Sequence, residues 1–443
     1  MNNNTIKYKN TNNDFVPQIP ENWEFLKMRH IGNLYSGLAG KAGKDFQIET
    51  SKYRYVPFTS ISNDIRVNLD KLALVKMSEG EIQNQVNKDD ILFLMSIKHG
   101  NTDEDNSTVS SDGPIIIYEN NKILGYQIFP KDTLFTTSKV EISKQDTLSC
   151  YVDETKDTFK FQLKDSLEIE PTEYALPNKM LVISDIEGNF KGFKSILLGN
   201  KIIDNKLNWT FGNNHLVLVG DFFDRGLNIT ECLWLIYKLE KEAEKQGGKV
   251  HFILGNHEMM NLKSELRYVR DKYHENADTL KLDYKKWYAN NTELGRWLRT
   301  KNGVEKIGDY LFVHAGIRKG FPEKYILKEI NENIRKSIDT NFEKGKKRDD
   351  IFIGNESPLW YRGIAKEDEN QKDIEKTLAK FKASKMIIGH TIFEEIQYLY
   401  NQKVITIDLE HKANSDKGKM YALWFENNDF KITDQNGAKT TLK

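Results

Sequence analysis

An alternation of short apolar runs and helical stretches, beginning at Lys179, constrains the fold of this chain most strongly. The apolar runs cover residues 180–184, 216–219 and 250–254, and the helical stretches between them cover residues 191–198 and 230–245. Alternating strands and helices predict an α/β domain with a largely buried central sheet. Such sheets bind ligands in the loops beyond the carboxyl ends of their strands. The chemistry of this domain is therefore expected in the residues that follow each apolar run.

Size and composition narrow the classes of protein to which the chain can belong. At about 150 residues per domain, its 443 residues suggest about two to three domains. Lys and Arg together number 65, as do Asp and Glu, and this balance argues against a strongly basic protein that coats nucleic acid. The two cysteines, Cys150 and Cys232, are too few and too far apart for a disulfide scaffold or a zinc knuckle. No apolar run approaches the roughly 20 residues of a membrane helix, and the polar N-terminus lacks the apolar core of a secretory signal. We therefore expect a cytoplasmic protein with no membrane partner.

Changes in composition divide the chain into five expected segments. Residues 101–113 are polar and contain no aromatic residue, which is typical of a linker, and the character of the sequence changes again at Lys179. The segments are a disordered, Asn-rich lead-in (1–14), a segment with strand-like runs (15–100), the linker (101–113), a β-rich accessory region (114–178) and the α/β domain (179–443).

Polar loops follow the three apolar runs of the α/β domain. They cover residues 185–189, 220–226 and 255–258, and two further histidines, His314 and His390, each follow a later apolar run. Carboxylates, an amide and imidazoles at one sheet edge are the ligands of a two-metal site. An aspartate shared by two cations about 3.5–4 Å apart would give a bridging hydroxide at neutral pH. The sequence therefore predicts a two-cation hydrolytic site at this edge.

Each loop also has a purely structural interpretation. Asp and Asn after a strand are common turn residues, and Asn256 could simply cap a helix that starts at Gly255-Asn-His-Glu258. The glycines in these loops allow sharp turns whether or not a ligand binds. Five such loops in succession, each at the end of an apolar run, favour the metal site over the structural interpretation.

The motifs resemble those of the calcineurin-like metallophosphoesterase superfamily. That superfamily has Asp-x-His, Gly-Asp-x-x-Asp-Arg, Gly-Asn-His-Glu, His and Gly-His in this order, and residues 179–443 contain the matching positions. Residues 254–262, 267–269, 294–298 and 358–362 are similar to segments of the Shewanella-like protein phosphatases and their bacterial relatives. The resemblance implies a β-sandwich flanked by helices, in four layers α/β/β/α, preceded here by β-rich N-terminal segments.

The resemblance also implies roles for individual residues. The implied metal ligands are Asp185, Glu187, Asp221, Asn256, His314 and His390, with Asp221 bridging both cations. The implied catalytic residues are His257 as general acid, Asp224 as its partner, and Arg225 and Arg362 as phosphoryl clamps, with Arg296 a third candidate clamp. The chain is therefore expected to hold two divalent metal ions.

One position departs from the superfamily pattern. The first motif reads Asp185-Ile-Glu187, where the superfamily usually has Asp-x-His. A third carboxylate on the first cation would favour Mn²⁺ or Mg²⁺ over Zn²⁺ or Fe and would make a bridging water less acidic. Alternatively, Glu187 weakens the first site and leaves a slow or single-metal enzyme. We favour an intact site with Mn²⁺, with Mg, Fe or Zn as alternatives, because the other motif residues are present.

Residues 15–100 resemble part of another family. The segments 16–25, 30–37, 55–58 and 88–93 are similar, in order, to the target recognition domain of type I restriction specificity subunits. This resemblance implies DNA as a partner, but the helical spacer of that family is missing and no basic stripe is visible. The alternative is a β-rich domain that shields or presents the catalytic domain.

Together these features predict a metal-dependent phosphoric-ester hydrolase. The leading hypothesis is a phosphomonoesterase, with phosphorylated Ser/Thr or Tyr proteins or small phosphoesters as substrates, in which a bimetal-bridged hydroxide attacks phosphorus directly. The first alternative is a nucleotide, dinucleoside-polyphosphate or phosphodiester hydrolase, since the same metal core serves both. The second is a DNA-targeted or non-catalytic binding module that acts through the N-terminal segment.

Overall fold

The computed structural model describes residues 109–131, 134–340 and 350–442, together with the backbone of four short strands nearer the N-terminus. The chain divides into two compact units, residues 1–101 and 102–443. In the first unit β1 (Tyr8–Asn10) pairs with β2 (Gln18–Pro20), and β3 (Arg54–Tyr55) pairs with β4 (Ala73–Leu74). The rest of the predicted segments 1–14 and 15–100, and residues 101–108 of the predicted linker, lie outside the described residues.

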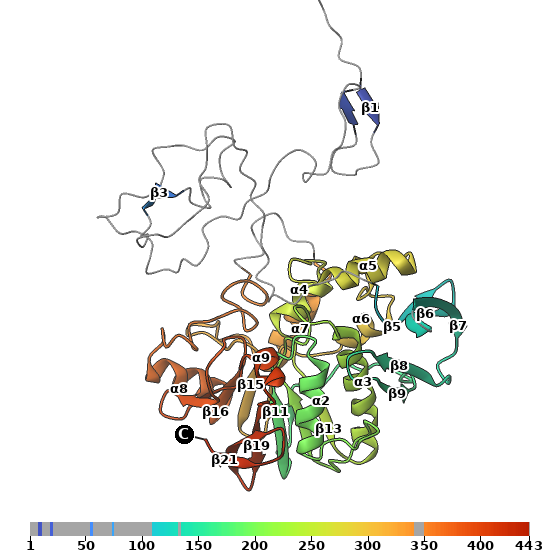
Figure 1. Cartoon of the computed structure of the whole chain (residues 1–443). Helices are drawn as coiled ribbons and strands as arrows, with labels where there is room; N and C mark the ends of the chain where they lie inside the picture. Colours follow the sequence, from blue (N-terminus) through green and yellow to red (C-terminus); the bar gives the residue numbers. More distant parts are fainter. Residues whose placement is uncertain are drawn as a thin grey trace, which may run out of the picture. The chain divides into compact units, whose positions relative to one another are not determined.

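Two six-stranded sheets form the centre of the second unit (Figure 1). The first sheet has the order β13 (Lys249–Phe252), β12 (His215–Leu218), β11 (Lys179–Ile183), β19 (Tyr421–Glu426), β20 (Asp429–Asp434), β21 (Lys439–Thr441). The second has the order β10 (Glu173–Tyr174), β14 (Val304–Ile307), β15 (Tyr310–Val313), β16 (Lys385–Ile388), β18 (Val404–Thr406), β17 (Gln397–Leu399). The three predicted apolar runs form β11, β12 and β13, which pair in parallel.

Alternate residues of β11 show how the layers are arranged. Met180 and Val182 belong to a core that also contains Phe312 and Ile387 of the second sheet. Leu181 and Ile183 belong instead to a larger core shared with the buried sides of the helices. Because successive side chains of a strand point to opposite faces, one face of β11 meets the other sheet and the other face meets helices. The predicted α/β/β/α sandwich is confirmed.

The helices begin where the sequence supplies caps and apolar spacing. Their bounds are α2 (Phe190–Gly199), α3 (Ile229–Lys245), α4 (Asn256–Leu262), α5 (Asp271–Leu280), α6 (Glu293–Leu298), α7 (Leu327–Ile338), α8 (Gln371–Lys380) and α9 (His411–Asp416), with a 3-10 turn η4 (Tyr284–Lys286). The Asn189 side chain caps α2 by accepting a bond from Gly192 N at 2.9 Å. Both predicted helical stretches, 191–198 and 230–245, are therefore helices in the structure.

A β-rich region packs beside α3 (Figure 1). It contains β5 (Asp112–Glu119), β6 (Lys122–Lys131), β7 (Leu134–Ile142), β8 (Leu148–Val152) and β9 (Asp157–Phe161). The ring of Phe161 stacks on Trp234 of α3 at 4.4 Å between centroids, and Trp234 Nε1 donates to the Pro114 carbonyl at 2.9 Å. These strands therefore share a core with the α/β layers, and β5 starts within the segment predicted as a linker.

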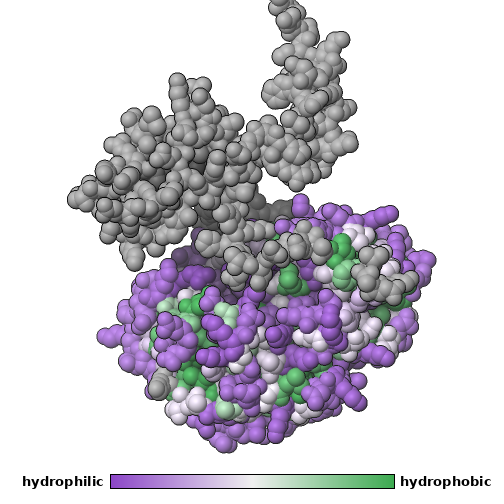
Figure 2. Space-filling view, viewed as in Figure 1, coloured by the Kyte–Doolittle hydropathy of each residue, from purple (hydrophilic) through white to green (hydrophobic). Residues whose placement is uncertain are grey.

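The surface of the second unit is mainly hydrophilic on the face shown in Figure 2, with small, scattered apolar patches. Among the described residues, no helix is both long and apolar enough to cross a membrane.

His411 makes the stability of this unit depend on pH. Its side chain is 2% exposed at the start of α9, and neither ring nitrogen has a hydrogen-bond partner among the described residues. Burial lowers the pKa of His411 from 6.5 to about 4. The unfolded chain therefore binds a proton at His411 below about pH 6.5, whereas the folded chain binds it only below about pH 4. Stability is lost as the pH falls through this range.

We expect His411→Leu to remove this source of acid sensitivity. Between pH 7 and pH 4, the unfolding free energy of the wild type should fall by about 3 kcal/mol more than that of the variant, which corresponds to the shift in pKa. Urea unfolding of both proteins across this range measures the difference. Parallel pH profiles for the two proteins would contradict the assignment.

Candidate metal centre

The strand ends bring the predicted site residues to one edge of the two sheets. Asp185 follows β11, Asp221 follows β12 and Asn256 begins α4 after β13, while His314 and His390 follow β15 and β16 of the second sheet. The first two loops are joined by backbone bonds, since Asp185 N donates to Gly220 O at 2.9 Å. The sandwich therefore places ligands from both sheets around a common point.

Backbone strain concentrates in these loops. Six site residues other than glycine have positive φ, namely Asp185 (54°), Glu187 (50°), Asp221 (58°), Asp224 (66°), Arg225 (58°) and His390 (66°). The left-handed region costs such residues of order 1–3 kcal/mol each, and such strain is typical of functional sites. The strained loops therefore support a functional role for this edge of the sandwich.

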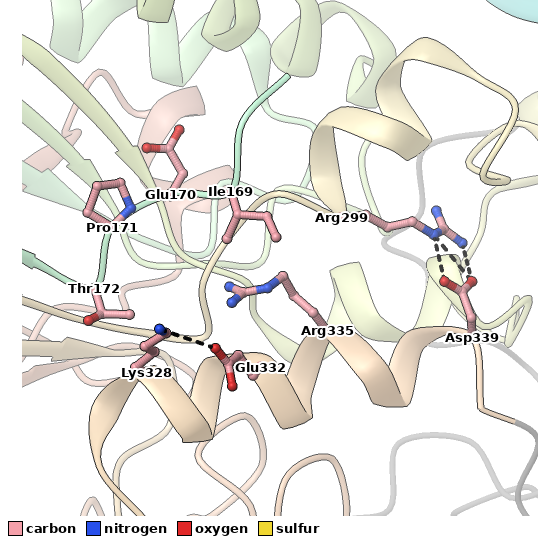
Figure 3. A pocket seen from close by; sticks show the side chains of 9 residues that line it. All are labelled: Ile169, Glu170, Pro171, Thr172, Arg299, Lys328, Glu332, Arg335 and Asp339. Carbon is pink, nitrogen blue, oxygen red and sulfur yellow. Dashed lines mark hydrogen bonds and ion pairs between the residues drawn. The ribbon is translucent and has the colours of Figure 1, made fainter. Parts of the chain in front are cut away.

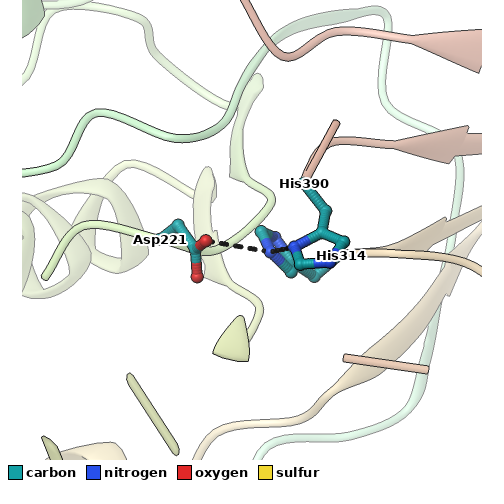
Figure 4. A group of neighbouring side chains, drawn as sticks. All are labelled: Asp221, His314 and His390. Carbon is teal, nitrogen blue, oxygen red and sulfur yellow. Dashed lines mark hydrogen bonds and ion pairs between the residues drawn. The ribbon is translucent and has the colours of Figure 1, made fainter. Parts of the chain in front are cut away.

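Two imidazoles lie against one another beside Asp221 (Figure 4). His314 Nδ1 donates to Val219 O at 2.8 Å, and His390 Nε2 donates to Trp360 O at 3.1 Å. These bonds engage one nitrogen of each ring, and the remaining nitrogens, His314 Nε2 and His390 Nδ1, lie 3.1 Å apart. Asp221 Oδ2 lies 3.1 Å from His314 Nε2, and Asn256 Oδ1 lies 3.0 Å from it.

Four atoms of the kinds that bind metal ions meet here, and their surroundings favour a positive charge between them. The ligand atoms of Asp221, His314 and His390 all lie within 4.8 Å of one another. Although burial opposes it, the Asp221 carboxylate raises the pKa of His314 to about 9, while His314 in turn lowers the pKa of the buried Asp221. The site thus favours a cation, and its mixed oxygen and imidazole donors suit a divalent transition metal.

Asp185 extends the donor set beyond this cluster. Its Oδ2 accepts the His390 backbone N–H at 3.1 Å, which leaves Oδ1 available to a ligand. Burial raises the pKa of Asp185 to about 6. Asp185 and Asp221 line the same cavity, so the residues present fit two cations that share Asp221.

Glu258 holds the second and third loops together. Its Oε2 accepts the backbone N–H groups of Asp221 and Gly255 at 2.8 and 2.7 Å, and its Oε1 accepts that of Phe222 at 2.7 Å. Gly220, with φ of 84°, also permits a close approach, since a Cβ there would lie 2.7 Å from His314 Nδ1. These contacts set the position of Asp221 relative to the imidazoles.

His257 is oriented by a chain of hydrogen bonds. Its Nδ1 lies 2.5 Å from Asp224 Oδ2, and Asn261 Nδ2 donates to Asp224 Oδ1 at 3.0 Å. The other ring nitrogen lies 3.9 Å from Asp221 Oδ2, beside the ligand cluster. Burial alone would lower the pKa of His257, but Asp221 and Asp224 raise it above its ordinary value. The arrangement thus turns His257 Nε2 toward the cavity and favours the protonated ring, which is the form that a general acid needs.

Two arginines line the cavity with His257. Arg362 Nη1 donates to His390 O at 2.8 Å and to Thr391 Oγ1 at 3.0 Å, which fixes the guanidinium at the rim. Arg225 lies over the Tyr268 ring at 5.5 Å and forms an ion pair with Glu187. Both arginines border the cavity, whose volume is about 210 Å³.

Two predicted or candidate residues lie elsewhere. Glu187 is not among the residues that line the cavity, because its carboxylate engages Arg225. Arg296 is also absent from the lining; its guanidinium lies over the Tyr118 ring at 4.4 Å, next to Glu293. Neither side chain joins the ligand cluster in this structure.

A larger cavity of about 590 Å³ contains none of the motif residues (Figure 3). Its charges are mostly paired with one another: Arg299 bonds to Asp339 at 2.8 Å, and Lys328 lies 3.9 Å from Glu332. Arg335 donates to Asn302 Oδ1 at 2.6 Å. The motif residues line the smaller cavity instead.

The sequence reasoning missed three residues of the site. Glu258 and Asn261 lie in α4 directly after the Gly-Asn-His motif, where hydrogen-bonding groups one turn apart face the same way. Asp408, which is 3% exposed, also lines the cavity. The sequence does contain a pattern that points to Asp408, because this residue follows the run 404–407 just as Asp185 and Asp221 follow their apolar runs. Burial and the nearby carboxylates of Asp185 and Asp221 raise the pKa of Asp408 well above its ordinary value.

Comparison with known proteins agrees with this geometry. The family model of calcineurin-like phosphoesterases matches residues 179–393. Shewanella-like protein phosphatase 2 of Arabidopsis thaliana is 28% identical over 289 residues, covering 55% of this chain and 73% of that protein. Shewanella-like protein phosphatase 1 of Plasmodium berghei is also 28% identical, over 268 residues, covering 57% of this chain and 73% of that protein.

A solved structure extends the match. The crystal structure of a cold-active protein-tyrosine phosphatase of a psychrophilic Shewanella species superposes with a TM-score of 0.67 at 31% identity. The match covers 76% of this chain and 100% of that one, which is more than residues 179–443 can supply. The shared fold therefore includes residues before Lys179. This chain belongs to the calcineurin-like phosphoesterase family, close to the Shewanella-like protein phosphatases, and is a hydrolase.

Proposed function

We propose that this protein is a metal-dependent phosphomonoesterase that acts on phosphorylated proteins. The observation that carries the proposal is a small cavity lined by Asp221, His390, Arg225, Arg362 and His257, with His314 in the ligand cluster directly beside it. A metal-ligand cluster, a cationic rim and a general acid are the groups that phosphoryl transfer to water requires.

The residues at the cavity fall into metal-binding, phosphate-binding and proton-donating groups. Asp185, Asp221, Asn256, His314 and His390 would hold two divalent cations. When bound, the cations supply Lewis acidity and lower the pKa of the attacking water. Arg225 and Arg362 orient the phosphoryl group through planar guanidinium contacts, and His257 protonates the leaving oxygen. Asp224 keeps the His257 ring in place.

The size and rim of the cavity favour a protein substrate. At about 210 Å³, the cavity is smaller than the roughly 300–1,000 Å³ that encloses a drug-sized ligand. It suits a phosphoryl group attached to a residue or molecule that stays outside the cavity. Ile392 at the rim is 57% exposed and Tyr268 beside Arg225 is 38% exposed. A phosphorylated side chain that is aromatic or apolar could contact both residues. The similarity to a protein-tyrosine phosphatase supports phosphotyrosine as the first substrate to test.

A substrate panel with metal-stripped protein tests the proposal. Mn²⁺, Mg²⁺, Zn²⁺ and Fe²⁺ are re-supplied separately with a phosphotyrosine peptide, a phosphoserine peptide and diadenosine tetraphosphate. We expect Mn²⁺ to support the highest rate, because carboxylate and amide oxygens dominate the donor set. We expect kcat/KM for a phosphopeptide to exceed that for the dinucleotide by about 100-fold, or about 2.7 kcal/mol. Preferential cleavage of the dinucleotide would instead establish the nucleotide-hydrolase alternative.

A further inference from the structure

Asp408 lines the cavity of the motif residues and follows a strand of the second sheet. It lies two residues beyond β18, and His390 lies two residues beyond β16, the parallel neighbour of β18. Ile388 pairs with Thr406 in that ladder, and Ile407 N donates to Ile388 O at 2.9 Å beyond it. Asp408 therefore continues the row of strand-end ligands by one strand.

The Asp408 side chain is buried without a partner. It is 3% exposed and lines the cavity with Asp185, Asp221 and His390. Its carboxylate makes no hydrogen bond or ion pair with the residues that the structure describes, although its backbone carbonyl accepts Phe393 N at 3.0 Å. Burial, Asp185 and Asp221 oppose its negative charge, whereas Arg225 and Arg362 favour it. A buried carboxylate that no partner contacts directly is costly, and a cation would provide that contact.

Glu187, in contrast, already has a partner. It occupies the motif position where the superfamily has histidine, but its carboxylate forms an ion pair with Arg225, and it is absent from the cavity lining. One carboxylate thus lines the cavity without a hydrogen-bond or ion-pair partner in the described part of the chain, while the carboxylate at the motif position is paired with Arg225.

We infer that Asp408 is the ligand of the first cation in place of the motif histidine, and that Glu187 positions Arg225 instead of binding metal. The inference rests on the two-cation centre of the proposed function. Asp185 and Asp221 would complete the first site with Asp408, while Asn256, His314 and His390 hold the second.

Metal stoichiometry tests this assignment directly. The full chain is stripped, dialysed against Mn²⁺, and its bound metal is counted by mass spectrometry for the wild type, Asp408→Asn, Glu187→Gln and Glu410→Gln. Glu410 is the matched control, because it is an exposed carboxylate two residues from Asp408. We expect two Mn²⁺ per chain in the wild type, Glu187→Gln and Glu410→Gln, and one in Asp408→Asn. Because loss of an indirect partner already costs 10–100-fold in metal affinity, Asp408→Asn should weaken the first site by more than about 100-fold.

Thermal unfolding of the metal-free proteins separates loss of a ligand from loss of the fold. Asp408→Asn should unfold close to the wild-type temperature, because Asn matches Asp in size and the Asp408 carboxylate has no hydrogen-bond partner among the described residues to lose. Asp408→Glu, which keeps a carboxylate, should retain more of the first-site affinity than Asp408→Asn does. Two bound Mn²⁺ in Asp408→Asn, or one in Glu187→Gln, would overturn the assignment, as would a wild type that binds a single cation.

The activity of the same wild-type preparation is measured separately. Metal-dependent cleavage of a phosphopeptide by a wild type that binds only one cation would sustain the proposed phosphatase and remove Asp408 as a ligand. Loss of one Mn²⁺ in Asp408→Asn without phosphopeptide cleavage by the wild type would sustain the ligand and remove the phosphatase. The two failures are therefore distinguishable.

Discussion

Asp221→Asn should reduce metal-dependent phosphoester hydrolysis by about 10⁴-fold, or about 5 kcal/mol of transition-state stabilisation. Asp221 Oδ2 lies 3.1 Å from His314 Nε2, at the centre of the ligand cluster, and the cavity lining places Asp221 beside Asp185 as well. An amide at this position removes the negative charge and presents either a neutral oxygen or an N–H group to the cations. Both cations should then bind weakly.

The fold should survive this substitution. Asp221 has φ of 58°, and Asn is among the residues that tolerate the left-handed region best. Its Oδ1 accepts the His257 backbone N–H at 3.0 Å, a bond that an amide oxygen can keep. Metal-free Asp221→Asn should therefore unfold at the same temperature as the metal-free wild type, within a few degrees.

Steady-state hydrolysis of p-nitrophenyl phosphate and equilibrium dialysis with Mn²⁺ measure the two effects. Asp429→Asn is the control, since Asp429 is an exposed carboxylate at the start of β20. It should keep wild-type activity and metal content. More than a tenth of wild-type activity in Asp221→Asn, with unchanged metal content, would mean that the reaction centre lies elsewhere.

The sequence predicts this centre well wherever ligands follow buried strands directly. The runs before Asp185, Asp221 and His314 are apolar enough to be recognised as strands, and parallel strands bring their carboxyl ends to the same edge. The position of the ligands thus follows from periodicity, and their identity follows from the motif. The layer order came from the resemblance, because strands such as β10, β17 and β18 have only two or three residues and cannot be assigned from pattern alone.

The sequence does not predict the directions in which the side chains near the cavity point. Glu187 and Asp408 are both carboxylates near a strand end, and the choice between them depends on Arg225, which lies 38 residues from Glu187 and attracts its side chain. Arg362 and Arg296 likewise looked interchangeable. Arg362 reaches the cavity because His390 O and Thr391 bind it there, whereas Arg296 lies over the Tyr118 ring. Long-range contacts of this kind decide roles that spacing leaves open.

The buried network beside α3 shows the same limit. Lys301 is 1% exposed and donates to Glu240 at 2.6 Å and to Glu170 at 3.0 Å, which joins α3 to the chain before β10. Each residue alone would be assigned to the surface by its charge. Their burial depends on partners 61 and 131 residues away, and no local pattern encodes those distances.

His257→Gln should distinguish substrates by the basicity of their leaving groups. A general acid contributes roughly 10²–10⁴-fold, and only where the leaving oxygen needs a proton. We expect kcat for a phosphoserine peptide to fall about 10³-fold, but that for p-nitrophenyl phosphate, whose nitrophenolate leaves without a proton, to fall about tenfold or less. Metal content should stay at the wild-type value, because His257 Nε2 lies 3.9 Å from Asp221 Oδ2 and outside the ligand cluster.

Asp224→Asn tests the role of the His257 proton, because Asp224 is the residue that binds the His257 ring. Asp224 accepts at 2.5 Å from His257 Nδ1 and at 3.0 Å from Asn261. An amide there keeps the shape but loses the negative charge that helps to hold the His257 proton, so the loss should again be larger for the phosphoserine peptide than for the nitrophenyl ester. His274 is an imidazole beside Tyr284 and outside the cavity lining, so His274→Gln is the control and should leave both rates unchanged.

Equal losses for both substrates in His257→Gln would show that this imidazole binds the phosphoryl group rather than protonating the leaving oxygen. The general acid would then have to be sought among the other groups at the cavity.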